Sequence, residues 1–199
     1  MRIGPVHLGG EHVVLEPLSR AHLGPLTAVL DPKLLQWFPK PVTNDGELAE
    51  FIEEALHAQD AGTALPFATI DRASGKVVGS TRFGNIDRAN HRLEIGWTWI
   101  ARPWQRSAIN TEAKLLMMEH AFETLGAIRV EFKTDSLNRQ SRAALTRLGA
   151  VEEGTFRNHM ITASGRVRHS VWFSVLDSEW NKVKKRLQDR LAANKAVDA

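Results

Sequence analysis

The chain has 199 residues, of which 43% are hydrophobic and 25% charged, with a net charge of +3 and no cysteine. This length suffices for one well-packed core and is short for two, so we expect a single domain over residues 1–199. The missing cysteines exclude disulfides, thiolate metal sites and a cysteine nucleophile, and the mild positive charge does not choose between a small anionic ligand and nucleic acid.

Targeting and metal signals are missing as well. No apolar run approaches the ~20 residues that cross a bilayer, so no membrane association is expected. Residues 1–12 lack the apolar stretch of a signal peptide, and the composition does not support secretion, which favours a cytoplasmic protein. The eight histidines form no H-x-x-x-H pair, so no metal site is expected.

Apolar periodicity and turn residues predict alternating strands and helices. Strands are expected at residues 12–18, 64–71, 76–87, 92–101, 128–134, 150–162 and 166–177. Helices are expected from Ser19 to about Leu30, from Asn44 onward, and over 110–125, 138–149 and 178–194, whereas 31–43 reads as irregular. The order β-α-α-β-β-β-α-β-α-β-β mixes hairpins with crossover helices, so we predict an α/β fold with a mixed sheet and helices on both faces.

The loop "QRSAIN" (105–110) stands between an expected strand and an expected helix. Ligands of such sheets tend to bind where a strand turns into a helix. A helix N-terminus leaves backbone N–H groups without partners, and these can bind an anion. Small residues at Ser107 and Ala108 would admit a phosphate, and Arg106 adds a charge. The loop therefore reads as a diphosphate-binding turn, or else as a plain loop before a capped helix.

Several short motifs strengthen the first interpretation. Residues 105–110 resemble the pyrophosphate loop Q/R-x-x-G-x-G/A of the GNAT N-acetyltransferase superfamily, and "TEA" (111–113) often follows it there. "EIGW" (94–97) resembles a strand motif of that family, and "NRQS" (138–141) with "LGA" (148–150) resembles its N-x-x-S…L-G-[FA] signature. The nearest subgroup is that of the ribosomal-protein N-terminal acetyltransferases.

The resemblance implies a fold, a reaction and a set of binding residues. The fold is that of the GNAT family, and the co-substrate is acetyl-CoA, whose acetyl group passes directly to a primary amine. Residues expected to bind it are Trp99, Ile100, Arg106, Ser107, Ala108, Ile109, Asn110, Thr111 and Asn138. A homodimer is expected by analogy alone.

Two departures from the family pattern stand out. Ala108 replaces the first glycine of the loop, and a methyl group fits there only if that residue avoids positive φ. The chain also has no tyrosine, which many family members use to protonate the leaving thiolate.

The reaction needs an uncharged amine, and both α-amino groups and lysines are mostly protonated at neutral pH. A carboxylate can take the proton, and Glu94 is our candidate base. Its alternative is a strand glutamate paired with Arg92 or Arg82. Ser141 is the candidate acid, or else a helix hydroxyl bonded to the preceding turn.

Trp37, Phe38 and Trp97 are expected to bind the acceptor, although buried packing would also account for any of them. The expected acceptor is the N-terminal amine of a protein or peptide. The alternatives are a small-molecule amine, a CoA-binding module without catalysis, and a basic RNA-associating protein. Nucleic-acid binding is the least expected of these, since only the C-terminal helix suggests it.

Overall fold

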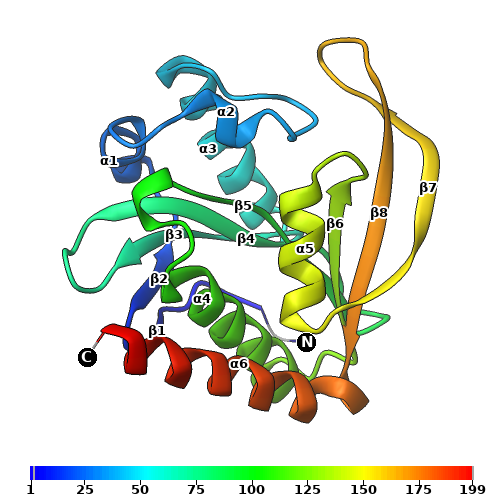
Figure 1. Cartoon of the computed structure of the whole chain (residues 1–199). Coiled ribbons are helices and arrows are strands. Elements are labelled where there is room, and N and C mark those ends of the chain that lie inside the picture. Colours follow the sequence, from blue (N-terminus) through cyan, green and yellow to red (C-terminus); the bar gives the residue numbers. More distant parts are fainter. Residues whose placement is uncertain (2, 199) are drawn as a thin grey trace.

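The computed structural model describes residue 1 and residues 3–198, which form one eight-stranded sheet with helices on both faces (Figure 1). The strands are β1 Leu8–Gly9, β2 Val13–Pro17, β3 Leu65–Asp71, β4 Val77–Asp87, β5 Arg92–Ile100, β6 Arg129–Asp135, β7 Val151–Ile161 and β8 Val167–Leu176. Their order is β1-β2-β3-β4-β5-β6-β8-β7, and only β5 and β6 are parallel neighbours. The predicted mixed α/β sheet is confirmed.

The helices follow the expected order along the chain. They are α1 Leu23–Thr27, α2 Pro32–Leu35, α3 Asp45–Asp60, α4 Ala108–Glu119, α5 Arg139–Leu148 and α6 Asp177–Asp198. Short 3₁₀ turns lie at Arg20–His22 and Arg102–Trp104, and a π-helical turn, His120–Thr124, continues α4. Asn44 caps α3 as expected, because its side chain accepts a hydrogen bond from the Glu47 amide at 3.0 Å.

Some boundaries predicted from the sequence were wrong. Residues 31–43 are not wholly irregular, since Asp31 caps α2 and Pro32 occupies its first position, where no N–H is needed. The helix expected from residue 110 begins at Ala108, because Ser107 is its N-cap. The last helix extends beyond 178–194 at both ends, and the two-residue strand β1 was not predicted.

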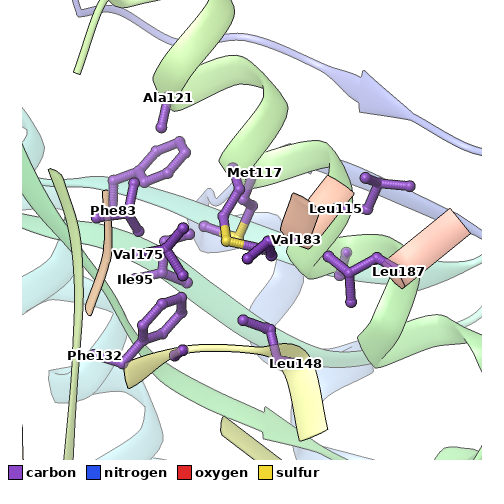
Figure 2. Packing of buried hydrophobic residues seen from close by; sticks show 14 of the residues in the cluster. Phe83, Ile95, Leu115, Met117, Ala121, Phe132, Leu148, Val175, Val183 and Leu187 are labelled. Carbon is purple, nitrogen blue, oxygen red and sulfur yellow. The ribbon is translucent and has the colours of Figure 1, made fainter. Parts of the chain in front are cut away.

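Two apolar clusters fill the space between the sheet and its helices. One lies between the sheet and helices α4, α5 and α6, and Figure 2 shows Phe83, Met117 and Val183 within it. The other lies between the sheet and α1–α3, and it includes Leu48, Phe51 and Trp99. Strands β4 and β5 therefore have one face toward α4 and the opposite face toward α3.

Strands β5 and β6 pair only at their beginnings, over Arg92–Glu94 and Arg129–Glu131. Beyond Glu94 the two strands separate, and the free edge of β5 is not covered by another strand of the described sheet. A bulge follows, with Trp97 at φ 50° and a register shift against β4. These features place unpaired backbone groups of β5 beside an opening in the sheet.

Glu112, the acid of the "TEA" motif, connects α4 to the start of the sheet. Its carboxylate is buried and accepts hydrogen bonds from the backbone amides of Glu11, His12 and Val13 at 2.6–2.8 Å. Gly10 leaves room for it, since a Cβ there would lie 2.3 Å from the carboxyl carbon. Glu112 thus fixes the turn before β2 and has a structural role in the described chain.

Candidate active site

The loop between β5 and α4 presents free amides at the N-terminus of α4. Arg106 has φ 62°, a left-handed conformation uncommon for a non-glycine residue. The Ser107 side chain caps the helix by accepting a hydrogen bond from the Ile109 amide at 3.3 Å. Within residue 1 and 3–198, the backbone N–H groups of Arg106, Ser107 and Ala108 have no hydrogen-bond acceptor. Three neighbouring free amides beside an exposed arginine fit a diphosphate group.

Ala108 raises no conformational obstacle to this loop. It is the first residue of α4 and is not among the described residues with positive φ. The left-handed position lies two residues earlier, at Arg106, so a methyl group at 108 is tolerated. Ile109 is buried in the core, whereas Asn110 and Thr111 are half-buried on the first turn of α4.

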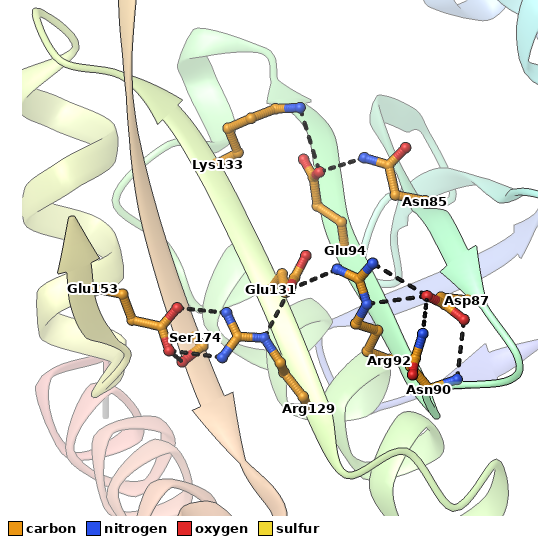
Figure 3. Close-up of polar contacts among 10 residues, drawn as sticks. All are labelled: Asn85, Asp87, Asn90, Arg92, Glu94, Arg129, Glu131, Lys133, Glu153 and Ser174. Atoms are coloured by element: carbon orange, nitrogen blue, oxygen red, sulfur yellow. Dashed lines mark hydrogen bonds and ion pairs between the residues drawn. The ribbon is translucent and has the colours of Figure 1, made fainter. Parts of the chain in front are cut away.

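Glu94 lies at the point where β5 and β6 separate. Its side chain is buried, with 4% of the residue exposed. The Asn85 amide donates a hydrogen bond to its carboxylate at 2.7 Å, and the Lys133 ammonium lies 3.6 Å away (Figure 3). The expected alternative partners, Arg92 and Arg82, do not pair with it in the described chain.

The environment of Glu94 suits a proton acceptor. Burial raises the pKa of its carboxyl above the ordinary value, and Lys133 and the Asn85 hydrogen bond oppose that shift. The carboxylate lines an open cavity of about 650 Å³ together with residues of β4 to β8. The other lining residues are Asn85, Arg92, Arg129, Glu131, Glu153, Gly154, Phe156 and Trp172. Glu94 is therefore buried within the fold yet open to a ligand.

The N-terminus of α5 lies against the loop of residues 105–110. The Gln140 side chain donates a hydrogen bond to the Gln105 side chain at 3.4 Å, and Gln105 in turn donates to the Ile100 carbonyl at 2.8 Å. Asn138 caps α5, because its side chain accepts from the Ser141 amide at 3.0 Å. The Ser141 hydroxyl, half-buried, makes no hydrogen bond within the described chain, so it does not bond back to the preceding turn.

Phe38 and Trp97 belong to a row of stacked side chains on the α3 side of the sheet. The Phe38 and Phe51 ring centres are 6.0 Å apart, and the guanidinium carbon of Arg82 lies 4.6 Å from the Phe51 ring and 4.8 Å from the Trp97 ring. Trp37 lies apart from this row, and its carbonyl accepts a hydrogen bond from Arg168 of β8 at 3.1 Å.

Trp99 and Ile100 have buried side chains, 3% and 7% exposed, in the α3 and α4 clusters respectively. Their side chains belong to the core, so only their backbone groups are available to a ligand. The motif at residues 94–97 identifies β5, the strand that carries both residues. The bulge at Trp97 affects which backbone groups of β5 face the opening.

Lys114 was not singled out by the sequence. Its side chain is buried beneath α4, and its ammonium group donates hydrogen bonds to Thr98 at 2.7 Å and Thr81 at 3.4 Å. Burial lowers the pKa of Lys114 to about 7. The signal was a lysine among the apolar positions of the helix at 108–119, which ordinarily marks a solvent-facing residue.

No helix in the described chain is long and apolar enough to span a membrane. Within residue 1 and 3–198, no group of three or more histidine or acidic side chains is arranged to hold a metal ion.

The parallel strands that separate, the loop of free amides and the buried carboxylate define an α/β protein with a site for an anionic ligand. Residues 12–151 match the family model described as the acetyltransferase (GNAT) domain, so the chain belongs to this family. The family predicted from the motifs is confirmed.

Individual relatives agree with this assignment. A Bacillus subtilis protein, YdaF, provisionally named a ribosomal N-acetyltransferase, is 34% identical over 53% of this chain and 57% of its own length. The structure of a GCN5-related N-acetyltransferase from Brucella melitensis is 35% identical, with a TM-score of 0.87 over 95% of this chain and 86% of that one. Mycobacterium smegmatis RimJ, solved with CoA-disulfide, shares the fold at 22% identity, with a TM-score of 0.76 over 94% of this chain and 93% of that one.

Proposed function

We propose that this chain transfers an acetyl group from acetyl-CoA to a primary amine by direct attack, and that the acceptor is the N-terminal amine of a protein or peptide. The observation that carries the proposal is the position of Glu94, a buried carboxylate at the mouth of the opening between β5 and β6. The agreement with a relative named for ribosomal acetylation supports the acceptor class. The composition supports a cytoplasmic location.

Glu94 acts as the general base. An α-amino group has a pKa near ~8 and must lose a proton before or during attack. A carboxylate with a raised pKa is a stronger base than an exposed one, and the charge of Lys133 helps to keep it ionised at neutral pH. Trp172 and Phe156 line the same cavity and supply its aromatic side chains.

The loop and the edge of β5 fit acetyl-CoA. Its acetyl thioester, when bound, supplies the carbon that the amine attacks. The amides of Arg106, Ser107 and Ala108 and the Arg106 charge bind the diphosphate. Backbone N–H groups of β5 near Trp97 stabilise the charge that develops on the thioester oxygen. The free Ser141 hydroxyl is the proton donor for the leaving thiolate, and Asn138 keeps its amide N–H₂ for the pantetheine arm while its oxygen caps α5.

The alternative of a CoA-binding module without catalysis loses one of its two supports, because Ala108 is helical and compatible with a bound diphosphate. Its second support is the missing tyrosine, and Ser141 or water can protonate the leaving thiolate in its place. Small amines remain the alternative acceptors.

The experiment is an acetylation screen with acetyl-CoA, in which mass spectrometry and CoA release are measured for N-terminal peptides and for small amines. We expect acetylated peptide N-termini at rates well above those of polyamines or aminoglycosides. Exclusive turnover of a small amine would overturn the acceptor class. Absence of turnover, despite stabilisation of the protein by acetyl-CoA, would leave a binding module.

A further inference from the structure

Arg82 is a buried cation for which the described chain supplies no anionic contact. It lies in the middle of β4, and only 6% of the residue is exposed. Within residue 1 and 3–198, its guanidinium makes no hydrogen bond and no ion pair, and only the charge of Glu54 acts on it from a distance. Burial lowers the pKa of Arg82 to about 10. The nitrogen atoms of Arg82 are not among the fully buried, unpaired polar atoms of the described chain, so they reach solvent and are available to a ligand.

The two neighbours of Arg82 fix its direction. Its guanidinium carbon lies 4.6 Å from the Phe51 ring and 4.8 Å from the Trp97 ring. These contacts stabilise the cation through the faces of the rings and leave the N–H groups at its rim unused. A stacked arginine is held in place and keeps its hydrogen-bonding fork for another partner.

The strand register brings Arg82 and Glu94 to one face of the sheet. Arg82 is opposite Gly96, and Gly84 is opposite Glu94. Directly opposite residues of antiparallel strands project to the same side, so Arg82 and Glu94 are diagonal neighbours, with Cα atoms about 7–8 Å apart in regular sheets. This is the face that α3 covers, because Phe51 of α3 contacts Arg82.

The other two positions of this four-residue patch are glycines. A Cβ at Gly96 would lie 2.8 Å from a Glu94 carboxylate oxygen, and a Cβ at Gly84 would lie 2.3 Å from the Trp97 ring. The carboxylate rests on the backbone at Gly96, and the Trp97 indole, which also contacts Arg82, rests on the backbone at Gly84, opposite Glu94. The patch holds one group that accepts a proton and another that only donates hydrogen bonds.

We propose that Arg82 binds an oxygen of the acceptor, either a peptide carbonyl or a carboxylate, and so selects amines that carry such an oxygen near the reacting nitrogen. The inference rests on the proposed function and names a specificity determinant for it. The planar fork of arginine matches both kinds of oxygen. A polyamine would instead place a second positive charge beside an unpaired guanidinium, which is unfavourable.

The test compares acceptors that differ in that oxygen. The parent and Arg82→Met are assayed with an alanine-initiated peptide amide, free alanine and isopropylamine, which lacks the oxygen. Methionine keeps an apolar chain between Phe51 and Trp97 but donates no hydrogen bond. We expect kcat/KM to fall about 10- to 100-fold for the oxygen-bearing acceptors, mainly through KM, and by less than about threefold for isopropylamine. A larger loss for the peptide amide identifies a carbonyl as the group that Arg82 binds, and a larger loss for free alanine identifies a carboxylate.

Controls separate this inference from its foundation. Arg20→Met removes a solvent-exposed guanidinium near α3 and should leave kcat/KM unchanged for every acceptor. Equal losses for all three acceptors would mean that Arg82 only holds the aromatic rings, and would overturn the inference while the proposed function stands. No turnover by the parent with any amine would overturn both. If Arg82→Met does not fold, the acceptor preference of the parent tests the inference. A higher kcat/KM for isopropylamine or a polyamine than for the peptide contradicts it.

Discussion

The two faces of strands β4 and β5 each bury one charged side chain, but in different surroundings. On the α4 face, Lys114 is enclosed, its ammonium donates hydrogen bonds to two threonine hydroxyls, and burial lowers its pKa to about 7. On the α3 face, Glu94 is equally buried but opens into a cavity and lies beside Lys133. An enclosed charge tends to neutralise, whereas one at the rim of a cavity can exchange protons with a ligand.

The bulge at Trp97 decides which side chain of β5 faces Lys114. Without it, side chains would alternate regularly from Ile95 onward. With it, both Trp97 and Trp99 join the α3 cluster, while Thr98 turns toward Lys114. We therefore expect substitutions at the opening and on the α3 face to change rates, and substitutions on the α4 face to change stability.

The largest of three expected effects concerns the opening itself. If Ser141 protonates the thiolate, Ser141→Ala should lower kcat by roughly 10²–10⁴-fold, the usual size of general acid catalysis, with acetyl-CoA affinity unchanged. Stopped-flow or steady-state CoA release measures the rate, and calorimetry measures the affinity. A loss below about threefold would assign the proton to water and Ser141 to the helix surface.

The second effect concerns the loop at the N-terminus of α4. Acetyl-CoA at ~100 times its dissociation constant should stabilise the parent by ~2.7 kcal/mol, which a thermal melt detects. Desulfo-CoA should do nearly as well, because the diphosphate carries most of the recognition. Ala108→Asp should abolish the shift by placing a carboxylate against the diphosphate, and Ala108→Gly should preserve it. If millimolar acetyl-CoA does not stabilise the parent, the proposed diphosphate site is wrong.

The third effect concerns the stability of the chain at the enclosed lysine. The pKa of Lys114 falls from 10.5 to about 7 in the folded chain, so the unfolded chain binds the extra proton between these values. The free energy of unfolding should therefore rise with pH from about 7 to about 10.5 on account of this residue. Lys114→Met should remove that slope and add stability at neutral pH, on the order of a few kcal/mol. Denaturant melts over this pH range measure it, and an unchanged slope would contradict an enclosed, shifted lysine.

The sequence predicted much of the fold for identifiable reasons. The strand-like segments 76–87 and 92–101, with clear turn residues between them, are strands in the structure. Asn44 and Asn138 each precede a helix and cap it. Short elements such as β1 and α2 were missed because two to four residues carry too little periodicity to be recognised.

The candidate site was predicted in part. The structure brings the loop 105–110, Asn138 and Ser141 to one side of the opening, and Glu94 to its mouth. Their roles stay predictions, as does the homodimer. Arg82 was weighed only as a partner for Glu94, and Lys114 was missed, because a charged residue within a strand or helix pattern ordinarily faces solvent.

The most direct test of Glu94 as base is the pH dependence of kcat/KM for the amine in the parent and in Glu94→Gln. Glutamine keeps the shape and can still accept the Asn85 hydrogen bond, but it cannot take a proton. Glu50→Gln makes the same change on the exposed side of α3 and serves as the control.

The account predicts that kcat/KM of the parent rises with pH to a plateau, and that Glu94→Gln is slower by roughly 10²-fold or more near neutral pH. The variant should recover part of this loss at high pH, where the amine is already uncharged, and its acetyl-CoA affinity should equal that of the parent. A variant as active as the parent at neutral pH would contradict the account, as would one that loses acetyl-CoA binding together with activity.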